Sequence, residues 1–179
     1  MAAITVFTAP YSDECRHSHD LLRRAAAILL DRDPGAVAQG QWGKPYFPEA
    51  DTLYFSISHS GEYWLCAFSA QPVGIDIQRR ESYLPPEKLS HRFFHPREDT
   101  FLAQDGYERF YDLWTAKESF VKFTGRGFFD EPDSFSVVGE GGSFPTAPGA
   151  QLRHIPFRDG YSVCICSEEI GGIVFRELT

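Results

Sequence analysis

The chain has 179 residues, of which 42% are hydrophobic and 23% are charged, an ordinary composition for a protein that folds around a core of its own. Its formal net charge of −8 argues against a general nucleic-acid binder and against binding to anionic membranes. No apolar run approaches the about 20 residues that a transmembrane helix needs, and the N-terminal residues lack the pattern of a signal peptide, so we expect a cytoplasmic protein.

The first half of the chain predicts strands and one helix. Residues 12–33 carry an apolar stripe at helical spacing, with Ser12 or Asp13 as the expected N-cap. Residues 34–50 are rich in glycine and proline and indicate a loop. The strands are expected at residues 4–9, in the two arms of a hairpin over 52–70 that turns near Gly61 and Glu62, and at 72–79.

Beyond residue 80, helical patterns come first and strand patterns follow. A long helix is expected over residues 107–124 and is stopped by Gly125, and two short helices precede it at 84–94 and 95–104. Further strands are expected at 134–139, 150–157, 160–167 and 172–178. Each half thus combines helical sequence with about three strands, so the expected fold class is α+β, with two similar lobes packed together.

The stretch VGIDIQRR, at residues 73–80, predicts a strand with two unlike faces. Side chains alternate along a strand, so the apolar face holds Val73, Ile75 and Ile77. Gly74, Asp76 and Gln78 share the other face, where the glycine leaves room for a bound molecule. The oxygen atoms of Asp76 and Gln78 are ligands that suit Mg²⁺. The alternative is a polar face turned to solvent.

The long helix carries Glu118 within an apolar stripe that includes Tyr111, Trp114 and Val121. A carboxylate in such a stripe is costly unless it is paired or bound to a metal ion. Lys122 lies four residues on, so an ordinary salt bridge on a half-exposed helix is one interpretation. The other is that Glu118 serves as a ligand of Mg²⁺, which takes few protein ligands.

A third candidate site combines Lys44 and His59 with a run of hydroxyls, Ser56, Ser58 and Ser60. Cationic groups and hydroxyls together can hold phosphate oxygens. The alternative is that His59 is a structural histidine near a strand end.

Four short motifs follow one another in the chain, namely K-P, F-S-I-S-H-S-G, G-I-D-I and W-T-A-K-E-S-F-V-K. In this order they resemble the 4'-phosphopantetheinyl transferase family, in the long monomeric form that acts on fatty-acid, polyketide and nonribosomal-peptide carrier proteins. The resemblance runs from about Gly43 to about Ser136. It implies two similar α+β lobes related by a pseudo-twofold, residues 1–80 and 81–179, with coenzyme A in the cleft between them.

The resemblance also implies a reaction. Phosphopantetheine passes from coenzyme A to a serine of an apo carrier protein in the presence of Mg²⁺, giving the holo carrier protein and 3',5'-ADP, which is the holo-acyl-carrier-protein synthase reaction. By position in the motifs, Asp76 and Glu118 resemble the metal ligands, with Gln78 beside them. Lys122 resembles the lysine on the reacting phosphate, and Glu118 is also expected to accept the proton of the serine.

The remaining motif residues resemble ligands of coenzyme A. Ser58 and His59 resemble the residues at the 3'-phosphate end of the nucleotide, and Lys44 resembles the lysine near a coenzyme A phosphate. Catalysis is then expected of Glu118, Lys122 and His59, since phosphoryl transfer consists mostly of positioning and charge neutralisation.

Two departures from the family pattern leave other functions open. Gln78 stands where many long members carry glutamate, and the segment before Lys44 is short. These departures allow a non-catalytic relative that binds coenzyme A or a nucleotide. A metal-dependent phosphodiesterase is the other alternative, although nothing in the sequence resembles a two-metal cluster.

Carrier proteins are usually acidic, so an acidic enzyme needs a local basic patch to bind one. The candidate residues are Lys88, His91, Arg92 and Arg97, with Phe93 and Phe94 nearby. The alternative is a solvated helix face without a partner.

Overall fold

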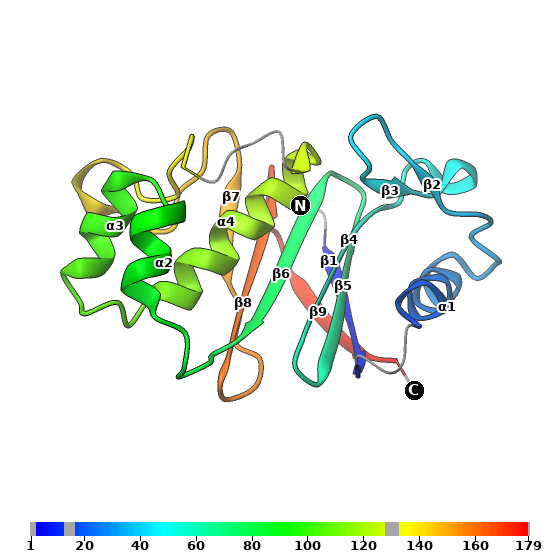
Figure 1. Cartoon of the computed structure of the whole chain (residues 1–179). Coiled ribbons are helices and arrows are strands. Elements are labelled where there is room, and N and C mark those ends of the chain that lie inside the picture. The colour runs from blue at the N-terminus through cyan, green and yellow to red at the C-terminus, as the bar shows by residue number, and fades with distance from the viewer. Residues whose placement is uncertain (1–2, 13–16, 128–132, 179) are drawn as a thin grey trace.

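The computed structural model describes residues 3–12, 17–127 and 133–178 of the chain. Two β-sheets lie side by side in the middle of the molecule, and helices lie on the two outer sides (Figure 1). This arrangement confirms the expected α+β class. No helix in the described part of the chain is long and apolar enough to span a membrane.

The first sheet has the strand order β4-β5-β1-β9. Its strands are β1 (Ile4–Pro10), β4 (Tyr54–Ser60), β5 (Tyr63–Ser69) and β9 (Ile173–Glu177). β4 and β5 form the expected hairpin, with Gly61 in its turn at a φ of 55°. The helix α1 (Ser18–Leu30) covers one face and shares a buried cluster with the sheet, in which Leu22 joins Phe7 and Trp64.

The second sheet is antiparallel and has the order β6-β8-β7. Its strands are β6 (Val73–Arg79), β7 (Gln151–His154) and β8 (Tyr161–Ser167). The helix α4 (Phe110–Thr124) lies against β6 and β8, and Gly125 ends it in the left-handed conformation, as expected. The two short helices α2 (Pro86–Phe93) and α3 (Pro96–Ala103) lie beyond α4 (Figure 1).

The strands β4 and β6 lie side by side where the two sheets meet (Figure 1). Three serine hydroxyls of β4 accept hydrogen bonds from backbone N–H groups of β6. These pairs are Ser56 with Ile75 at 3.1 Å, Ser58 with Ile77 at 3.3 Å, and Ser60 with Arg79 at 2.9 Å. A buried backbone N–H needs an acceptor, so this serine row takes the place of a β-ladder between the sheets. It also turns one face of β4 toward Asp76.

The prediction of a strand at residues 134–139 is wrong. These residues form bends and irregular backbone instead, although their sequence alternates apolar and polar residues. The backbone N–H of Val137 donates to the Glu98 carboxylate at 2.7 Å, and that of Val138 donates to the Ser136 hydroxyl at 3.1 Å. Side chains thus supply the acceptors that a neighbouring strand would otherwise provide.

Some element boundaries also differ from those expected. The first helix begins at Ser18 rather than beside Ser12, and Asp13 lies outside the described residues. The segment expected to be loop, residues 34–50, contains the short strands β2 (Ala38–Gln39) and β3 (Pro45–Tyr46) and the 3₁₀ turn η1 (Pro48–Ala50). A further 3₁₀ turn, η3 (Glu140–Gly142), lies before β7.

The division of the chain into lobes at residue 80 stays a prediction. The sheets are built across that point, because β6 pairs with β8 while the C-terminal β9 returns to pair with β1. The connection from β6 to α2 and the connection from β8 to β9 therefore both link the two halves of the molecule.

Candidate active site

Asp76 lies at the junction of three elements and is 2% exposed. Its Oδ1 atom accepts hydrogen bonds from Ser58 Oγ and from Lys122 Nζ, both at 2.7 Å. The three residues belong to β6, β4 and α4, so the cluster forms only when the sheets and the helix pack together. The strand alternation predicted from the sequence is correct, because Val73, Ile75 and Ile77 lie in the opposite, apolar core.

Gly74 allows α4 to approach β6 closely. A Cβ atom at this position would lie 1.9 Å from the carbonyl oxygen of Ser119 and 2.6 Å from the backbone nitrogen of Phe123. The expectation that Gly74 leaves room for a bound molecule is therefore wrong, since the helix backbone fills that space. The glycine instead sets how near Lys122 and Glu118 come to Asp76.

Lys122 pairs with Asp76 rather than with Glu118. The Lys122–Asp76 distance is 2.7 Å, and the side chains are 29% and 3% exposed. Glu118 makes no hydrogen bond or ion pair with any residue that the structure describes. Burial and the negative charge of Asp76 raise the pKa of Glu118, and the charge of Lys122 opposes that shift. The local salt bridge considered from the sequence does not form.

The second oxygen of Asp76 lacks a partner. Oδ2 is buried, and none of the described residues forms a hydrogen bond with it. Burial raises the pKa of Asp76, while Lys122, Ser58 and Gln78 act in the opposite direction. Two neighbouring carboxylates with unpartnered oxygens fit a hard divalent cation, because its charge would offset both burial and their mutual repulsion.

Gln78 is half-buried on the same face of β6 as Asp76. The side chain of Gln78 lowers the pKa of Asp76, and its Oε1 accepts a long hydrogen bond of 3.5 Å from Ser60 Oγ. It therefore faces the site and not bulk solvent. In the described part of the chain, no group of three His, Cys, Asp or Glu side chains is placed to hold a metal ion, and this neutral amide is the candidate for a third ligand.

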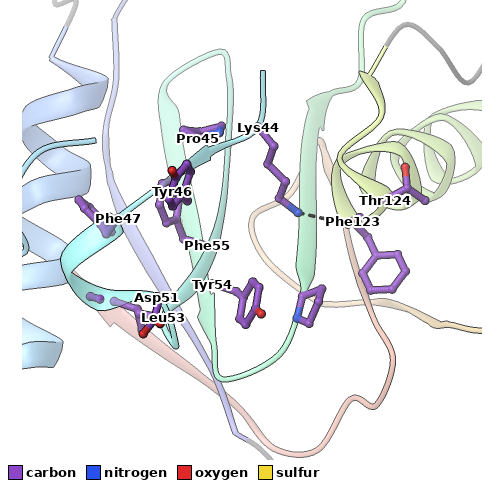
Figure 2. A pocket seen from close by; sticks show the side chains of 12 residues that line it. Lys44, Pro45, Tyr46, Phe47, Asp51, Leu53, Tyr54, Phe55, Phe123 and Thr124 are labelled. Carbon is purple, nitrogen blue, oxygen red and sulfur yellow. Dashed lines mark hydrogen bonds between the residues drawn. The ribbon is translucent and has the colours of Figure 1, made fainter. Parts of the chain in front are cut away.

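Lys44 reaches from the loop before β3 to the end of α4 (Figure 2). Its ammonium group donates to the backbone carbonyls of Val73 at 3.1 Å, Lys122 at 2.6 Å and Phe123 at 3.2 Å. Burial lowers the pKa of Lys44 to about 8. An ammonium has three donors, and all three are used here. The side chain thus caps the last turn of α4 and ties it to the start of β6.

Changing Lys44 to methionine should lower the free energy of unfolding by about 1–3 kcal/mol, because carbonyl groups at the end of α4 would lose their donor while the apolar stem is kept. Urea denaturation measures this effect. Lys88→Met, at an exposed position of α2, is the matched control and should change stability by less than about 0.5 kcal/mol. Equal stability of the two variants would contradict a capping role.

His59 lies apart from Asp76. Its imidazole is exposed and stacks on the ring of Tyr11, with a centroid distance of 4.3 Å and an interplanar angle of 22°. Successive side chains of β4 point to opposite faces, so Ser58 faces β6 while His59 faces the other way. The structure therefore brings together Ser58, Asp76, Gln78, Glu118 and Lys122 but separates His59 from them.

Two cavities flank Lys44. One has a volume of about 250 Å³ and is lined by Trp42, Gly43, Ser56, Val121 and Lys122, among others. The other has a volume of about 340 Å³ and extends between Tyr46 and Tyr54 on one side and Phe123 and Thr124 on the other (Figure 2). Both have mostly apolar walls, and the first reaches the site through Lys122.

A buried ion pair beside the site was missed from the sequence. Lys117 and Glu98 are 4% and 0% exposed, and their charged groups lie 2.8 Å apart. Lys117 Nζ also donates to the carbonyl of Phe135 at 2.8 Å, so α3, α4 and the segment after residue 133 are tied together next to Glu118. The available signal was Lys117 itself, a charged residue within the apolar pattern of the long helix.

The candidate docking residues on and beside α2 and α3 differ in exposure. Lys88, His91, Arg92 and Arg97 are exposed, and Phe93 is 39% exposed. Phe94 is 7% exposed and packs in the core against Phe110, so it cannot belong to a surface patch.

Comparison with known proteins assigns this chain to a family. Residues 72–166 match the 4'-phosphopantetheinyl transferase superfamily. The chain is 39% identical over 123 residues to a 4'-phosphopantetheinyl transferase of Bacillus subtilis, covering 65% of this chain and 54% of that protein. It is 40% identical over 112 residues to the transferase Sfp of Bacillus subtilis strain 168, covering 60% and 49%. It is 30% identical over 165 residues to HetI of a Nostoc species, covering 85% and 68%.

The chain thus spans about half the length of the first two of these relatives. The matched region includes β6, α4 and β8. It therefore contains Asp76, Gln78, Glu118 and Lys122, whereas Lys44 and Ser58 lie before it.

Proposed function

Because the chain belongs to the 4'-phosphopantetheinyl transferase superfamily, we propose that it transfers 4'-phosphopantetheine from coenzyme A to a serine of an apo carrier protein. The holo carrier protein and 3',5'-ADP are the products, as in the holo-acyl-carrier-protein synthase reaction. The observation that supports this proposal most strongly is the buried carboxylate of Asp76. It is held by Lys122 and Ser58 through one oxygen and leaves the other without a described partner, next to Glu118.

The side chains of the site have complementary roles in this proposal. Asp76 and Glu118 would hold Mg²⁺, with the amide of Gln78 as a neutral third ligand. The ion supplies positive charge for the diphosphate of coenzyme A. Lys122 would place its ammonium on the reacting phosphate, where positive charge stabilises the charge of the transition state. Glu118 would accept the proton of the attacking serine.

Coenzyme A has room beside this cluster. The cavity that reaches Lys122 offers mostly apolar walls for a ring or an aliphatic arm, and the second cavity continues it past Lys44. His59 is exposed and remains a proposed ligand of the nucleotide's phosphate end and a proposed catalytic residue. Binding of coenzyme A by Lys44 and Ser58 stays a prediction. Their polar atoms already form hydrogen bonds within the protein.

The carrier protein is proposed to bind near α2. Lys88 and Arg92 present positive charge there, His91 is exposed between them, and Phe93 adds an exposed apolar surface. We further propose a monomeric enzyme of the cytoplasm, since the resemblance points to the long monomeric type.

An intact-mass assay tests the proposed function. The chain is incubated with coenzyme A, Mg²⁺ and a panel of apo carriers from fatty-acid, polyketide and peptide synthesis. An active transferase adds the mass of one phosphopantetheine group to a carrier. A non-catalytic binder would leave every carrier unchanged, and a phosphodiesterase would cleave coenzyme A without any carrier; either result would contradict the proposal.

The change Gln78→Glu should tighten Mg²⁺ binding. A carboxylate replaces an amide of nearly the same shape, so one negative charge is added beside Asp76. The Mg²⁺ concentration for half-maximal activity should fall by about tenfold, equivalent to ~1.4 kcal/mol. The turnover number should also fall, because an ion neutralised by a further charge polarises phosphate less.

The measurement is a Mg²⁺ titration of activity at saturating coenzyme A. Gln104→Glu makes the same chemical change at an exposed position just after α3 and should leave the curve unchanged. Superimposable curves for Gln78→Glu and the unmodified chain would remove Gln78 from the site.

A further inference from the structure

The hydroxyl of Ser58 has no bonding capacity left for a ligand. It donates to Asp76 Oδ1 at 2.7 Å and accepts from Lys122 Nζ at 2.9 Å and from the Ile77 N–H at 3.3 Å. A hydroxyl has one donor hydrogen and two acceptor lone pairs, so all three are used. The residue is 6% exposed.

The serine row provides an internal comparison. Ser56 is also 6% exposed, and its hydroxyl accepts from the backbone N–H of Ile75 at 3.1 Å. Ser56 therefore shares with Ser58 the bond that joins β4 to β6. Ser58 alone of these two also contacts Asp76 and Lys122.

We propose that Ser58 is a positioning residue for the Asp76–Lys122 pair. This inference rests on the proposed function. Ser58 and Lys122 hold Oδ1 from two different elements, so the carboxylate is fixed in the one orientation that leaves Oδ2 without a described partner. A carboxylate held by two donors loses rotational freedom before it meets a cation, which is how supporting residues orient metal ligands.

The hydroxyl also keeps Lys122 in place. Nζ of Lys122 donates to the Ser58 hydroxyl at 2.9 Å and to Asp76 Oδ1 at 2.7 Å at once. Without the hydroxyl, Lys122 would lose one acceptor and could turn toward Glu118, its neighbour four residues back on α4. The lysine would then neutralise the carboxylate proposed to hold Mg²⁺ and to accept the serine proton.

Three variants separate the positioning role from two other roles of a buried serine, namely a ligand of the nucleotide and a purely structural link between β4 and β6. Ser58→Ala removes the hydroxyl, Ser58→Thr keeps it on a residue that strands favour, and Ser56→Ala removes only the bond between β4 and β6. The turnover number and the KM for coenzyme A are measured for each. Mg²⁺ binding is measured by calorimetry without coenzyme A, and stability by thermal unfolding.

Ser58→Ala should lower the turnover number by about tenfold or more and weaken Mg²⁺ binding by a similar factor, while the KM for coenzyme A stays within about twofold. Ser58→Thr should restore both values to within about threefold. Ser56→Ala should lower the unfolding temperature as much as Ser58→Ala does and leave Mg²⁺ binding unchanged, because the Ser56 hydroxyl bonds to Ile75 rather than to Asp76 or Lys122.

Other outcomes would overturn the inference. A raised KM for coenzyme A with unchanged turnover and Mg²⁺ binding would make Ser58 a nucleotide ligand. Equal losses of Mg²⁺ binding in Ser56→Ala and Ser58→Ala would make Ser58 merely structural. An unmodified chain that binds Mg²⁺ but transfers nothing would contradict the proposed function alone, since the calorimetry still decides the role of Ser58. An unmodified chain that binds no Mg²⁺ would contradict the inference itself.

Discussion

Changing Asp76 to asparagine is expected to abolish phosphopantetheine transfer while leaving the chain folded. The amide keeps the shape of the side chain but removes the negative charge that faces Lys122 and Glu118. The loss should exceed a factor of about ten in turnover, equivalent to ~1.4 kcal/mol, because one of only two carboxylates in the proposed cation site disappears. Mg²⁺ binding measured by calorimetry should weaken in parallel.

The fold should tolerate this change. Lys122 is 29% exposed and keeps the Ser58 hydroxyl as an acceptor, so the stability loss should stay within about 1–3 kcal/mol rather than reach the cost of stranding a fully buried charge. Thermal unfolding reports this directly. Glu118→Gln should behave like Asp76→Asn in activity with a smaller effect on stability, since Glu118 has no described partner to lose.

Asp112→Asn is the matched control. Asp112 lies in the first turn of α4, the helix that carries Glu118. It accepts hydrogen bonds of 2.6 Å from Arg80 and from Ser162, so it is also a carboxylate with a cationic and a hydroxyl partner. It lies one and a half turns before Glu118 and outside the Asp76 cluster. Activity retained in this variant and lost in Asp76→Asn would assign the effect to the site. Transfer by Asp76→Asn at more than about a tenth of the normal rate would contradict the assignment.

Changing Gly74 to alanine is expected to be the most disruptive single substitution for the fold. The added methyl would lie 1.9 Å from the Ser119 carbonyl oxygen, a backbone atom that cannot move without its helix. The helix α4 would have to shift away from β6, which should lower the free energy of unfolding by about 3 kcal/mol or more. Transfer should be lost as well, because Lys122 and Glu118 move with the helix.

Gly172→Ala is the control for this change. Gly172 lies just before β9, and a Cβ atom there would meet nothing within 4 Å. It should change stability by less than about 0.5 kcal/mol. Urea denaturation of both variants provides the measurement, and a Gly74→Ala protein as stable as Gly172→Ala would show that α4 can be displaced at little cost.

Much of the fold follows from local patterns. The hairpin of β4 and β5, the strand β6, the long helix α4 and its stop at Gly125 all lie where alternation, helical spacing and a terminal glycine predict them. The expected strand at residues 134–139 does not form, because the N–H of Val137 bonds to Glu98, which is distant in sequence, and the N–H of Val138 bonds to the Ser136 hydroxyl. Alternation reports which faces are apolar, and it does not report which acceptors lie nearby.

The sequence by itself determined the family and which candidate residues share a face of a strand or a helix. Asp76 and Gln78 share a strand face, and Glu118 and Lys122 share a helix face, because strand and helix periodicities are local properties. The motif order identified the family before any contact was known.

Only the tertiary structure decided which of these residues touch. Lys122 binds Asp76, which lies 46 residues away, and not Glu118, which lies four residues before it on the same helix. A buried carboxylate is stabilised more by a nearby cation than a less buried one is. Ser58 joins the cluster while His59, the next residue, faces away, since the packing of β4 against β6 selects one face of the strand. Partner choice depends on burial, and burial is a property of the packed molecule that a residue pattern does not contain.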